Sequence, residues 1–233
     1  MAQYYGYNNN SGGLLSRLFG NMPEVTRNLF LVNVLMFIAT QINQNFMIST
    51  FSVFYPASPF FRIWQIVTYL FMHGNFWHLF VNMWGLLMFG SALERALGPK
   101  KYLLFFFLTG LGALAIHFGI QFIQVHSLLA DHSAAGQASY INILRTPTLG
   151  ASGAIYGIQI GYAMLYPNDM WTLLFPPVTL KAKWFVLIFI GIELFTGVTG
   201  TMDGIAHFAH LGGALFGFLL ILYWKKTGKI WRR

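Results

Sequence analysis

The sequence predicts an all-α integral membrane protein: a six transmembrane helix bundle with a partly embedded outer loop between helices 1 and 2. Apolar residues make up 56% of the 233-residue chain, and charged residues only 9%. Phenylalanine alone contributes 24 residues. This composition excludes an ordinary soluble domain and a disordered chain.

Six apolar segments approach the length that a membrane span needs, which is about 20 mostly apolar residues. They cover residues 28–44, 76–94, 102–124, 150–166, 183–199 and 204–224. We therefore expect three parts, a cytoplasmic N-terminal tail, a six-helix membrane domain and a basic cytoplasmic C-terminal tail, at residues 1–27, 28–224 and 225–233.

The segment after the first span, residues 45–67, is aromatic and contains Pro56 and Pro59. It is too broken to span and too apolar for a free loop. We interpret it as an outer segment partly embedded at the membrane interface, although a loop folded over the bundle would give the same pattern. The expected interfacial aromatic residues are Phe51, Phe54, Tyr55, Phe60, Phe61 and Trp64.

The other long connections are predicted to be loops. Gly98-Pro99 ends the second span, since this pair stops a helix. Residues 126–148 form a polar outer loop, and residues 167–182 form an inner loop with three prolines.

Positive charge is distributed unevenly. The net charge is +8, which in a soluble protein would suggest nucleic acid as a partner. Of the 14 Lys and Arg residues, however, only Arg62 and Arg145 fall in the predicted outer segments. This bias places both termini in the cytoplasm and makes nucleic acid binding unnecessary as an explanation. The chain has no Cys, which excludes disulfides, thiolate catalysis and Cys-ligated metals.

Polar side chains inside the predicted spans are costly and therefore candidates for function. They are His78, Asn82, Ser152, Glu193, His207 and His210. With a rise of about 1.5 Å per residue from the cytoplasmic end of each span, Asn82 lies about 20 Å deep, and Ser152 and His210 about 22 Å. His78 lies one turn beyond Asn82 on the same face. These side chains are therefore expected at one level.

Ser152 and His210 at equal depth suggest acyl transfer, because a serine hydroxyl needs a neighbouring imidazole to take its proton. Glu193 comes out about 15 Å from the cytoplasmic end, more than one turn away from the serine. We therefore predict a Ser-His dyad without an acid. The ring of Tyr156, one turn after Ser152, could stack on the imidazole in place of a third group.

A tetrahedral intermediate also needs hydrogen-bond donors for its oxyanion. Asn82, His78 and the backbone N–H of Ser152 at a helix N-terminus could supply them. Gly150 and Gly153 leave space around that point. The polar lining could hold water, so the site is expected to open to the external side.

Each of these residues also has a structural interpretation. Glycines of the fourth and sixth spans could form packing faces, at Gly150, Gly153, Gly157, Gly161, Gly213 and Gly217. His117 could hydrogen-bond a neighbour, and Glu193 could be held by a hydroxyl such as that of Thr196. His207 and His210 could ligate a metal with His73 or His78. The sequence lacks His-Glu-x-x-His, so no metal is predicted.

Three ordered motifs are HGNFWHLFVNMWG (73–85), GASGAIYG (150–157) and AHFAHLGGALFG (206–217). Together with the six spans, they resemble the rhomboid family of intramembrane serine proteases. The resemblance implies that Ser152 is the nucleophile, that His210 is the general base, and that His78 and Asn82 contribute to the oxyanion hole.

Three further residues bear on the resemblance. His73 fits the outer histidine of the family, and Trp64 fits the tryptophan of its embedded loop. Gln65 departs from the arginine often found at the next position, which leaves the anchoring of this loop open.

The expected function is therefore a serine endopeptidase that cleaves transmembrane protein substrates within or next to their spans. Its expected surroundings are the lipid bilayer of a bacterial-type cytoplasmic (inner) membrane, and it needs no cofactor. A non-catalytic membrane-protein-binding relative and a transporter with a polar substrate path are the alternatives. The sequence sets neither the substrate nor the oligomeric state.

Overall fold

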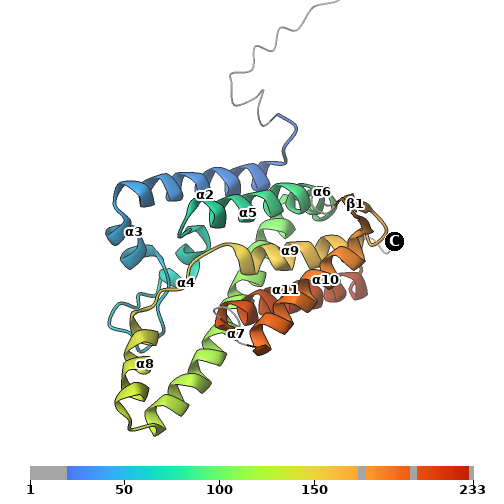
Figure 1. Cartoon of the computed structure of the whole chain (residues 1–233). Coiled ribbons are helices and arrows are strands. Elements are labelled where there is room, and N and C mark those ends of the chain that lie inside the picture. Colours follow the sequence, from blue (N-terminus) through green and yellow to red (C-terminus); the bar gives the residue numbers. More distant parts are fainter. Residues whose placement is uncertain (1–19, 173–176, 200–203, 231–233) are drawn as a thin grey trace, which may run out of the picture.

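A computed structural model describes residues 20–172, 177–199 and 204–230, and within these ranges the chain is almost entirely helical (Figure 1). The first 19 residues of the expected N-terminal tail and residues 231–233 of the expected C-terminal tail lie outside the described residues. The bundle consists of α2 (Glu24–Ile42), α5 (Phe76–Gly85) continued by the π-helical η2 (Leu86–Gly90) and α6 (Ser91–Leu97), α7 (Pro99–Ala130), α9 (Ser152–Leu165), α10 (Ala182–Thr199) and α11 (Gly204–Lys226).

Five helices in the described ranges are long and apolar enough to cross a membrane. They are Glu24–Ile42, Phe76–Leu97, Pro99–Ala130, Ala182–Thr199 and Ala206–Lys226. The remaining bundle helix, α9, has only 14 residues, a length of about 21 Å. The chain is therefore an all-α membrane protein in which one helix is shorter than the hydrocarbon core.

The short helix α9 packs against both α7 and α11. Small residues allow this close approach: a Cβ at Gly213 would overlap the carbonyl oxygen of Gly153, and a Cβ at Gly217 would lie 2.7 Å from that of Gly157. These pairs form the small-residue contact that lets two membrane helices come close. Since α9 begins at Ser152, the fold places this serine among the helices and not at the end of a full span.

The connection between α2 and α5 contains α3 (Gln44–Phe51), α4 (Gln65–Thr68) and the 3-10 helix η1 (Tyr69–Phe71). Phe54 and Tyr55 are buried, so their expected interfacial placement is wrong. They pack inward because residues 52–55 run against the protein, where Val53 forms an antiparallel bridge with Thr148. About half of the Trp64 side chain is exposed.

Gln65 anchors this connection although it replaces the arginine expected there. Its side chain is fully buried. Its Oε1 accepts from the backbone N–H of Arg62 at 2.9 Å, and its Nε2 donates to the carbonyl oxygens of Ser49 and Phe60, both at 3.1 Å. The neighbouring Trp64 Nε1 donates to the carbonyl oxygen of Thr50 at 2.9 Å. The Gln65 amide therefore connects the end of α3 with residues 60–62, which precede α4.

The prediction that residues 126–148 form a loop is wrong over most of that range. Helix α7 continues to Ala130, and α8 (Ala134–Arg145) follows after a short turn. The hydroxyl of Ser133 caps α8 by accepting from the N–H of Gly136 at 3.0 Å. The hairpin of α7 and α8 projects from the rest of the bundle (Figure 1), and residues 126–148 are polar. Hydropathy therefore gives no signal for α8, although it is a helix.

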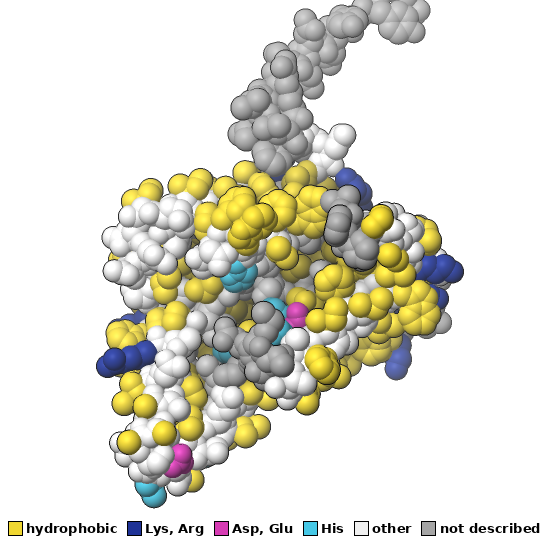
Figure 2. Space-filling view, in the orientation of Figure 1, with side chains coloured by type: hydrophobic (Ala, Val, Ile, Leu, Met, Phe, Trp, Pro, Cys, Tyr) yellow, Lys and Arg dark blue, Asp and Glu magenta, His cyan; other side chains and the backbone are white. Residues whose placement is uncertain are grey.

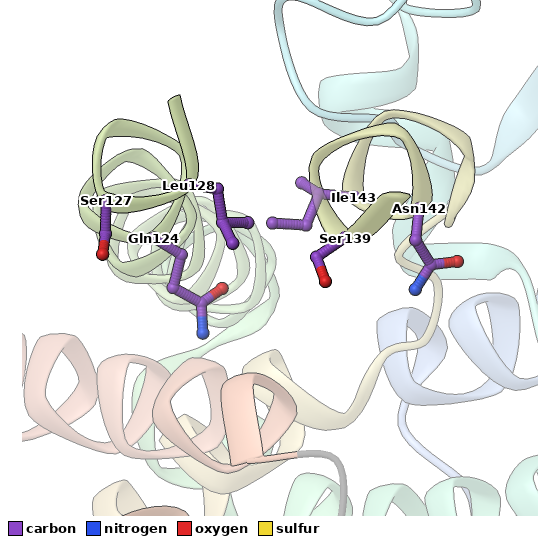
Figure 3. A pocket seen from close by; sticks show the side chains of 6 residues that line it. All are labelled: Gln124, Ser127, Leu128, Ser139, Asn142 and Ile143. Atoms are coloured by element: carbon purple, nitrogen blue, oxygen red, sulfur yellow. The ribbon is translucent and has the colours of Figure 1, made fainter. Parts of the chain in front are cut away.

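The hairpin of α7 and α8 encloses a shallow hollow of about 350 Å³. Figure 3 shows Leu128 and Ile143 pointing toward each other across it, one from each helix. The remaining lining residues are Gln124, Ser127, Ser139 and Asn142. The hairpin thus has a mostly polar inner lining around one apolar contact.

The connection between α9 and α10 contains a two-stranded antiparallel hairpin, which the sequence did not predict. Strand β1 (Met170–Thr172) pairs with β2 (Thr179–Lys181), and Trp171 lies opposite Leu180. The side chain of Trp171 packs beside the ring of Phe89 in η2. Strand β1 therefore lies at one end of the bundle, near the C-terminus (Figure 1).

Candidate active site

Ser152 and His210 meet in the interior of the bundle. Ser152 is the first residue of α9, and His210 lies in the first half of α11. Ser152 Oγ lies 2.8 Å from His210 Nε2, a hydrogen-bonding distance. The chain that leads to the serine is fixed by the backbone N–H of Gly150, which donates to the carbonyl oxygen of Tyr69 at 2.9 Å.

An acidic side chain also reaches this pair, which corrects the expectation of a dyad without an acid. Glu193 Oε2 lies 3.0 Å from His210 Nδ1 and 2.6 Å from His207 Nδ1. Its other oxygen, Oε1, accepts from the hydroxyl of Tyr156. The depth count failed because it placed only backbones on straight, parallel helices; one turn is about 5.4 Å, which a glutamate and an imidazole side chain together can bridge.

Tyr156 has two contacts in this cluster. Besides its hydroxyl contact with Glu193, its ring lies nearly parallel to that of His210, with centroids 4.6 Å apart. Tyr156 follows Ser152 by four residues, so both side chains stand on the same face of α9. The face of the imidazole that Tyr156 covers is therefore closed to other partners.

The Ser152–His210 pair lines a cavity of about 370 Å³. The other residues lining it are Trp77, His78, Val81, Asn82, Ile155, Tyr156, Gln159, Phe189 and Glu193. Figure 2 shows histidine side chains and an acidic side chain near the middle of one face, with apolar side chains around them. Five of the six polar residues that the sequence singled out, His78, Asn82, Ser152, Glu193 and His210, thus line one cavity.

A second cavity of about 460 Å³ adjoins the first. Both include Val81 of α5, Gln159 of α9 and Phe189 of α10. The lining of the second is otherwise mostly apolar, with Phe80, Trp84, Met88, Phe89, Trp171 and Phe185. An apolar space between α5 and α10 therefore leads to the Ser152 cavity.

His78 and Asn82 line the Ser152 cavity from α5. The side chain of Asn75 caps α5 by accepting from the N–H of His78 at 2.8 Å. Asn82 Nδ2 donates to the carbonyl oxygen of His78 at 2.7 Å, which uses one of the two N–H bonds of this amide. The ring of His73 lies next to that of His78, with centroids 4.9 Å apart.

Both the backbone conformation at position 150 and the space around it require a glycine. Its φ is +126°, a conformation that residues with a side chain rarely adopt. A Cβ here would also lie 2.7 Å from His78 Nε2. Gly153 instead allows α9 to pack against α7, because its Cβ would overlap that of Ala113.

A rhomboid domain model matches residues 60–226. The chain belongs to the rhomboid family. It is 30% identical over 194 residues to RHOMBOID-like protein 12, mitochondrial, of Arabidopsis thaliana, covering 82% of this chain and 55% of that protein. It is 28% identical over 167 residues to Rhomboid protease AarA of Providencia stuartii, covering 67% and 54%. The rhomboid chain therefore spans about half the length of these curated relatives.

A third relative is Rhomboid protein 1, mitochondrial, of Saccharomyces cerevisiae. It is 31% identical over 163 residues, covering 70% of this rhomboid chain and 42% of the yeast protein. The domain match, residues 60–226, includes the three motifs that predicted the family.

The sequence also offered hydrogen-bond partners for two polar residues of this rhomboid, His117 and Glu193. His117 Nε2 lies 2.7 Å from the hydroxyl of Thr148, so this histidine does hydrogen-bond a neighbour. A hydroxyl does hold the Glu193 carboxylate, but it is that of Tyr156 and not that of Thr196. The Thr196 hydroxyl has other partners. It donates to the carbonyl oxygen of Ile192 at 2.8 Å and lies 3.1 Å from His207 Nδ1.

One group of side chains in the described part of the rhomboid could hold a metal ion: Glu193, His207 and His210, whose ligand atoms lie within 4.8 Å of one another. His73 and His78, which the sequence offered as further ligands, are not in this group. The same three side chains are already joined by hydrogen bonds through Glu193 Oε2. Their arrangement is therefore explained without a metal.

Sequence reasoning considered Glu193 but gave it no role in the site. The sequence signal was that Glu193 is the only acidic residue of the predicted span 183–199. It is buried in the structure, whereas half of the residues of α10 are exposed. A lone acid on the packed face of a span points into the bundle.

Proposed function

We propose that this rhomboid is an intramembrane serine endopeptidase that cleaves transmembrane protein substrates within or next to their membrane-spanning segments. The observation that carries the proposal is the 2.8 Å distance between Ser152 Oγ and His210 Nε2 inside a membrane bundle. Similarity to a protein named Rhomboid protease AarA supports it. A transporter would not need a serine and an imidazole in hydrogen-bond contact, and a non-catalytic relative would not need to keep them.

The proposed reaction begins when Ser152 Oγ attacks the scissile carbonyl carbon while His210 Nε2 takes the hydroxyl proton. The carbonyl oxygen becomes an oxyanion, for which the N–H of Ser152, His78 and Asn82 are the proposed donors. His210 then gives the proton to the leaving amine, which departs and leaves an acyl-enzyme. A water molecule activated by His210 releases the second product and restores the serine. No metal or cofactor takes part in these steps.

The two adjoining cavities suggest how substrate reaches the serine. The cavity between α5 and α10 is mostly apolar and suits a lipid-facing helix, whereas the one at Ser152 also has polar side chains in its lining, which can hydrogen-bond water and an unwound peptide. We propose that a substrate segment enters from the bilayer between α5 and α10. Its backbone would then unfold beside Ser152, because a helical peptide bond is shielded from attack.

We further propose that the protein lies in a bacterial-type cytoplasmic membrane, with both termini cytoplasmic and the site opening to the external side. The charge bias supports this orientation. Most of the Lys and Arg side chains visible in Figure 2 lie at the end of the molecule where Figure 1 places β1 and the C-terminus. The opposite end carries α3 and α8 (Figure 1).

Labelling by a serine-reactive fluorophosphonate, combined with cleavage of a transmembrane substrate in liposomes, tests the proposed function. Wild-type protein should label and cleave, and Ser152→Ala should do neither. Ser127→Ala is the matched control, because Ser127 lies in the α7–α8 hairpin outside the Ser152 cavity. Cleavage by Ser152→Ala at the wild-type rate would show that the proposed function is wrong.

A further inference from the structure

We propose that Glu193 is a positioning residue for His210, so that the site works as a Ser-His-Glu triad. This inference rests on the proposed function. It concerns the carboxylate that approaches His210 from α10, a helix that carries neither the serine nor the histidine. The Ser152 hydroxyl and the Glu193 carboxylate contact opposite nitrogens of one imidazole.

The contact with Glu193 decides which nitrogen of His210 carries the proton. An ionised carboxylate only accepts hydrogen bonds, so Nδ1, 3.0 Å from Oε2, must be the donor. Nε2 of a neutral imidazole then has a free lone pair. Nε2 lies 2.8 Å from Ser152 Oγ, so its lone pair can accept the hydroxyl proton. The tautomer with the proton on Nδ1 is therefore the one that a general base needs.

The stacked Tyr156 ring cannot make this choice. Stacking fixes the plane of the imidazole but does not distinguish Nδ1 from Nε2. The Tyr156 hydroxyl contributes differently, because it donates to Glu193 Oε1 and so orients the carboxylate. Tyr156 and Glu193 therefore restrain separate properties of His210, its plane and its tautomer.

The carboxylate is itself held in place. Only 8% of the Glu193 surface is exposed, and a buried acid in a membrane span is costly unless it is paired. His207 Nδ1 supplies a second partner at 2.6 Å from Oε2, and the Tyr156 hydroxyl contacts Oε1. This set of contacts leaves Glu193 little freedom to turn away from His210.

The same contact would stabilise the charge that forms during the reaction. When His210 takes the serine proton it becomes an imidazolium, and a carboxylate 3.0 Å from Nδ1 favours that state. The effect is larger than in water because the surroundings are apolar. A carboxylate with this role lowers the barrier to turnover and has little influence on substrate binding.

The experiment compares Glu193→Gln, Glu193→Leu and Glu193→Asp in cleavage of a transmembrane substrate in liposomes, with rates normalised to the folded fraction. In a soluble triad the acid-to-amide change lowers kcat by about 10⁴. We expect kcat to fall about 10- to 100-fold in Glu193→Gln, because the amide oxygen can still accept from Nδ1 although the negative charge is lost, and to fall further in Glu193→Leu, which offers no acceptor. Glu193→Asp should recover part of the loss. KM should stay within about twofold of wild type in all three variants.

Thr196→Val is the matched control, since it removes a hydroxyl near His207 without touching His210, and its kcat should stay near wild type. The proposal is wrong if Glu193→Gln and Glu193→Leu keep wild-type kcat. It is also wrong if Glu193→Asp is as slow as Glu193→Leu and all three variants lose thermal stability equally, because Glu193 would then be structural. Both results leave the proposed function intact so long as Ser152→Ala is inactive. Cleavage by Ser152→Ala would overturn the proposed function instead.

Discussion

The rings of Tyr156 and His210 stack with their planes 11° apart, while the Tyr156 hydroxyl contacts Glu193. The two contacts can be separated by mutation. Tyr156→Phe keeps the stacked ring and should lower kcat only a few-fold. Tyr156→Leu loses the ring and the hydroxyl and should lower kcat by up to about 100-fold, because small misplacements of a catalytic group have effects of that order. Equal kcat for both variants in the liposome cleavage assay would argue against a role for stacking.

Ser152 and His210 should behave as one catalytic unit. Removing either member of such a unit costs about as much as removing both. Ser152→Ala, His210→Ala and the double variant should therefore show the same residual cleavage. Fluorophosphonate labelling should be absent in Ser152→Ala and nearly absent in His210→Ala. A double variant much slower than either single variant would contradict this coupling.

Asn82 offers the cavity one amide N–H, because the other donates to the His78 carbonyl oxygen. Asn82→Ala should leave Ser152 and His210 in contact and remove one oxyanion donor. Loss of such a donor costs about 10²–10³ in kcat in a soluble enzyme, and less where other donors compensate. Turnover and labelling rates measure the effect, and labelling should slow without disappearing. An unchanged kcat would remove Asn82 from the oxyanion hole.

Activity should not depend on a metal ion. The reaction proposed for Ser152 uses no metal, so excess chelator should leave cleavage in detergent unchanged. Added zinc should inhibit, because Glu193, His207 and His210 present ligand atoms within 4.8 Å of one another and a bound ion would occupy His210 Nδ1. Loss of activity in chelator that zinc restores would make these residues metal ligands.

Orientation can be tested with reporters. A reporter fused after residue 233 should behave as cytoplasmic, and one inserted at His132, in the turn between α7 and α8, as external. The turn is preferable to a position within α8, where Gly136 packs closely against Asp131. Fluorescent and periplasmic enzyme fusions report the two sides. Reversed signals would place the opening of the Ser152 cavity on the cytoplasmic side.

Hydropathy predicted the all-α membrane class because a bilayer leaves few ways to satisfy the backbone. The motifs around Ser152 and His210 predicted the rhomboid family, which the domain match confirms. The same reasoning failed where hydropathy was weak. It took α8 for a loop because its faces are polar, and it assigned Phe54 and Tyr55 to the interface although the Val53 bridge draws them inward.

The sequence by itself therefore determined the membrane class, the family and the candidate residues, because these depend on composition and on motifs local to one helix. The domain boundaries and the roles of the site residues stay predictions. Only the tertiary structure decided that Glu193 of α10 meets His210 of α11. Helix tilt, close packing through Gly153 and Gly213, and side-chain reach set that contact, and none of them can be counted along a single helix.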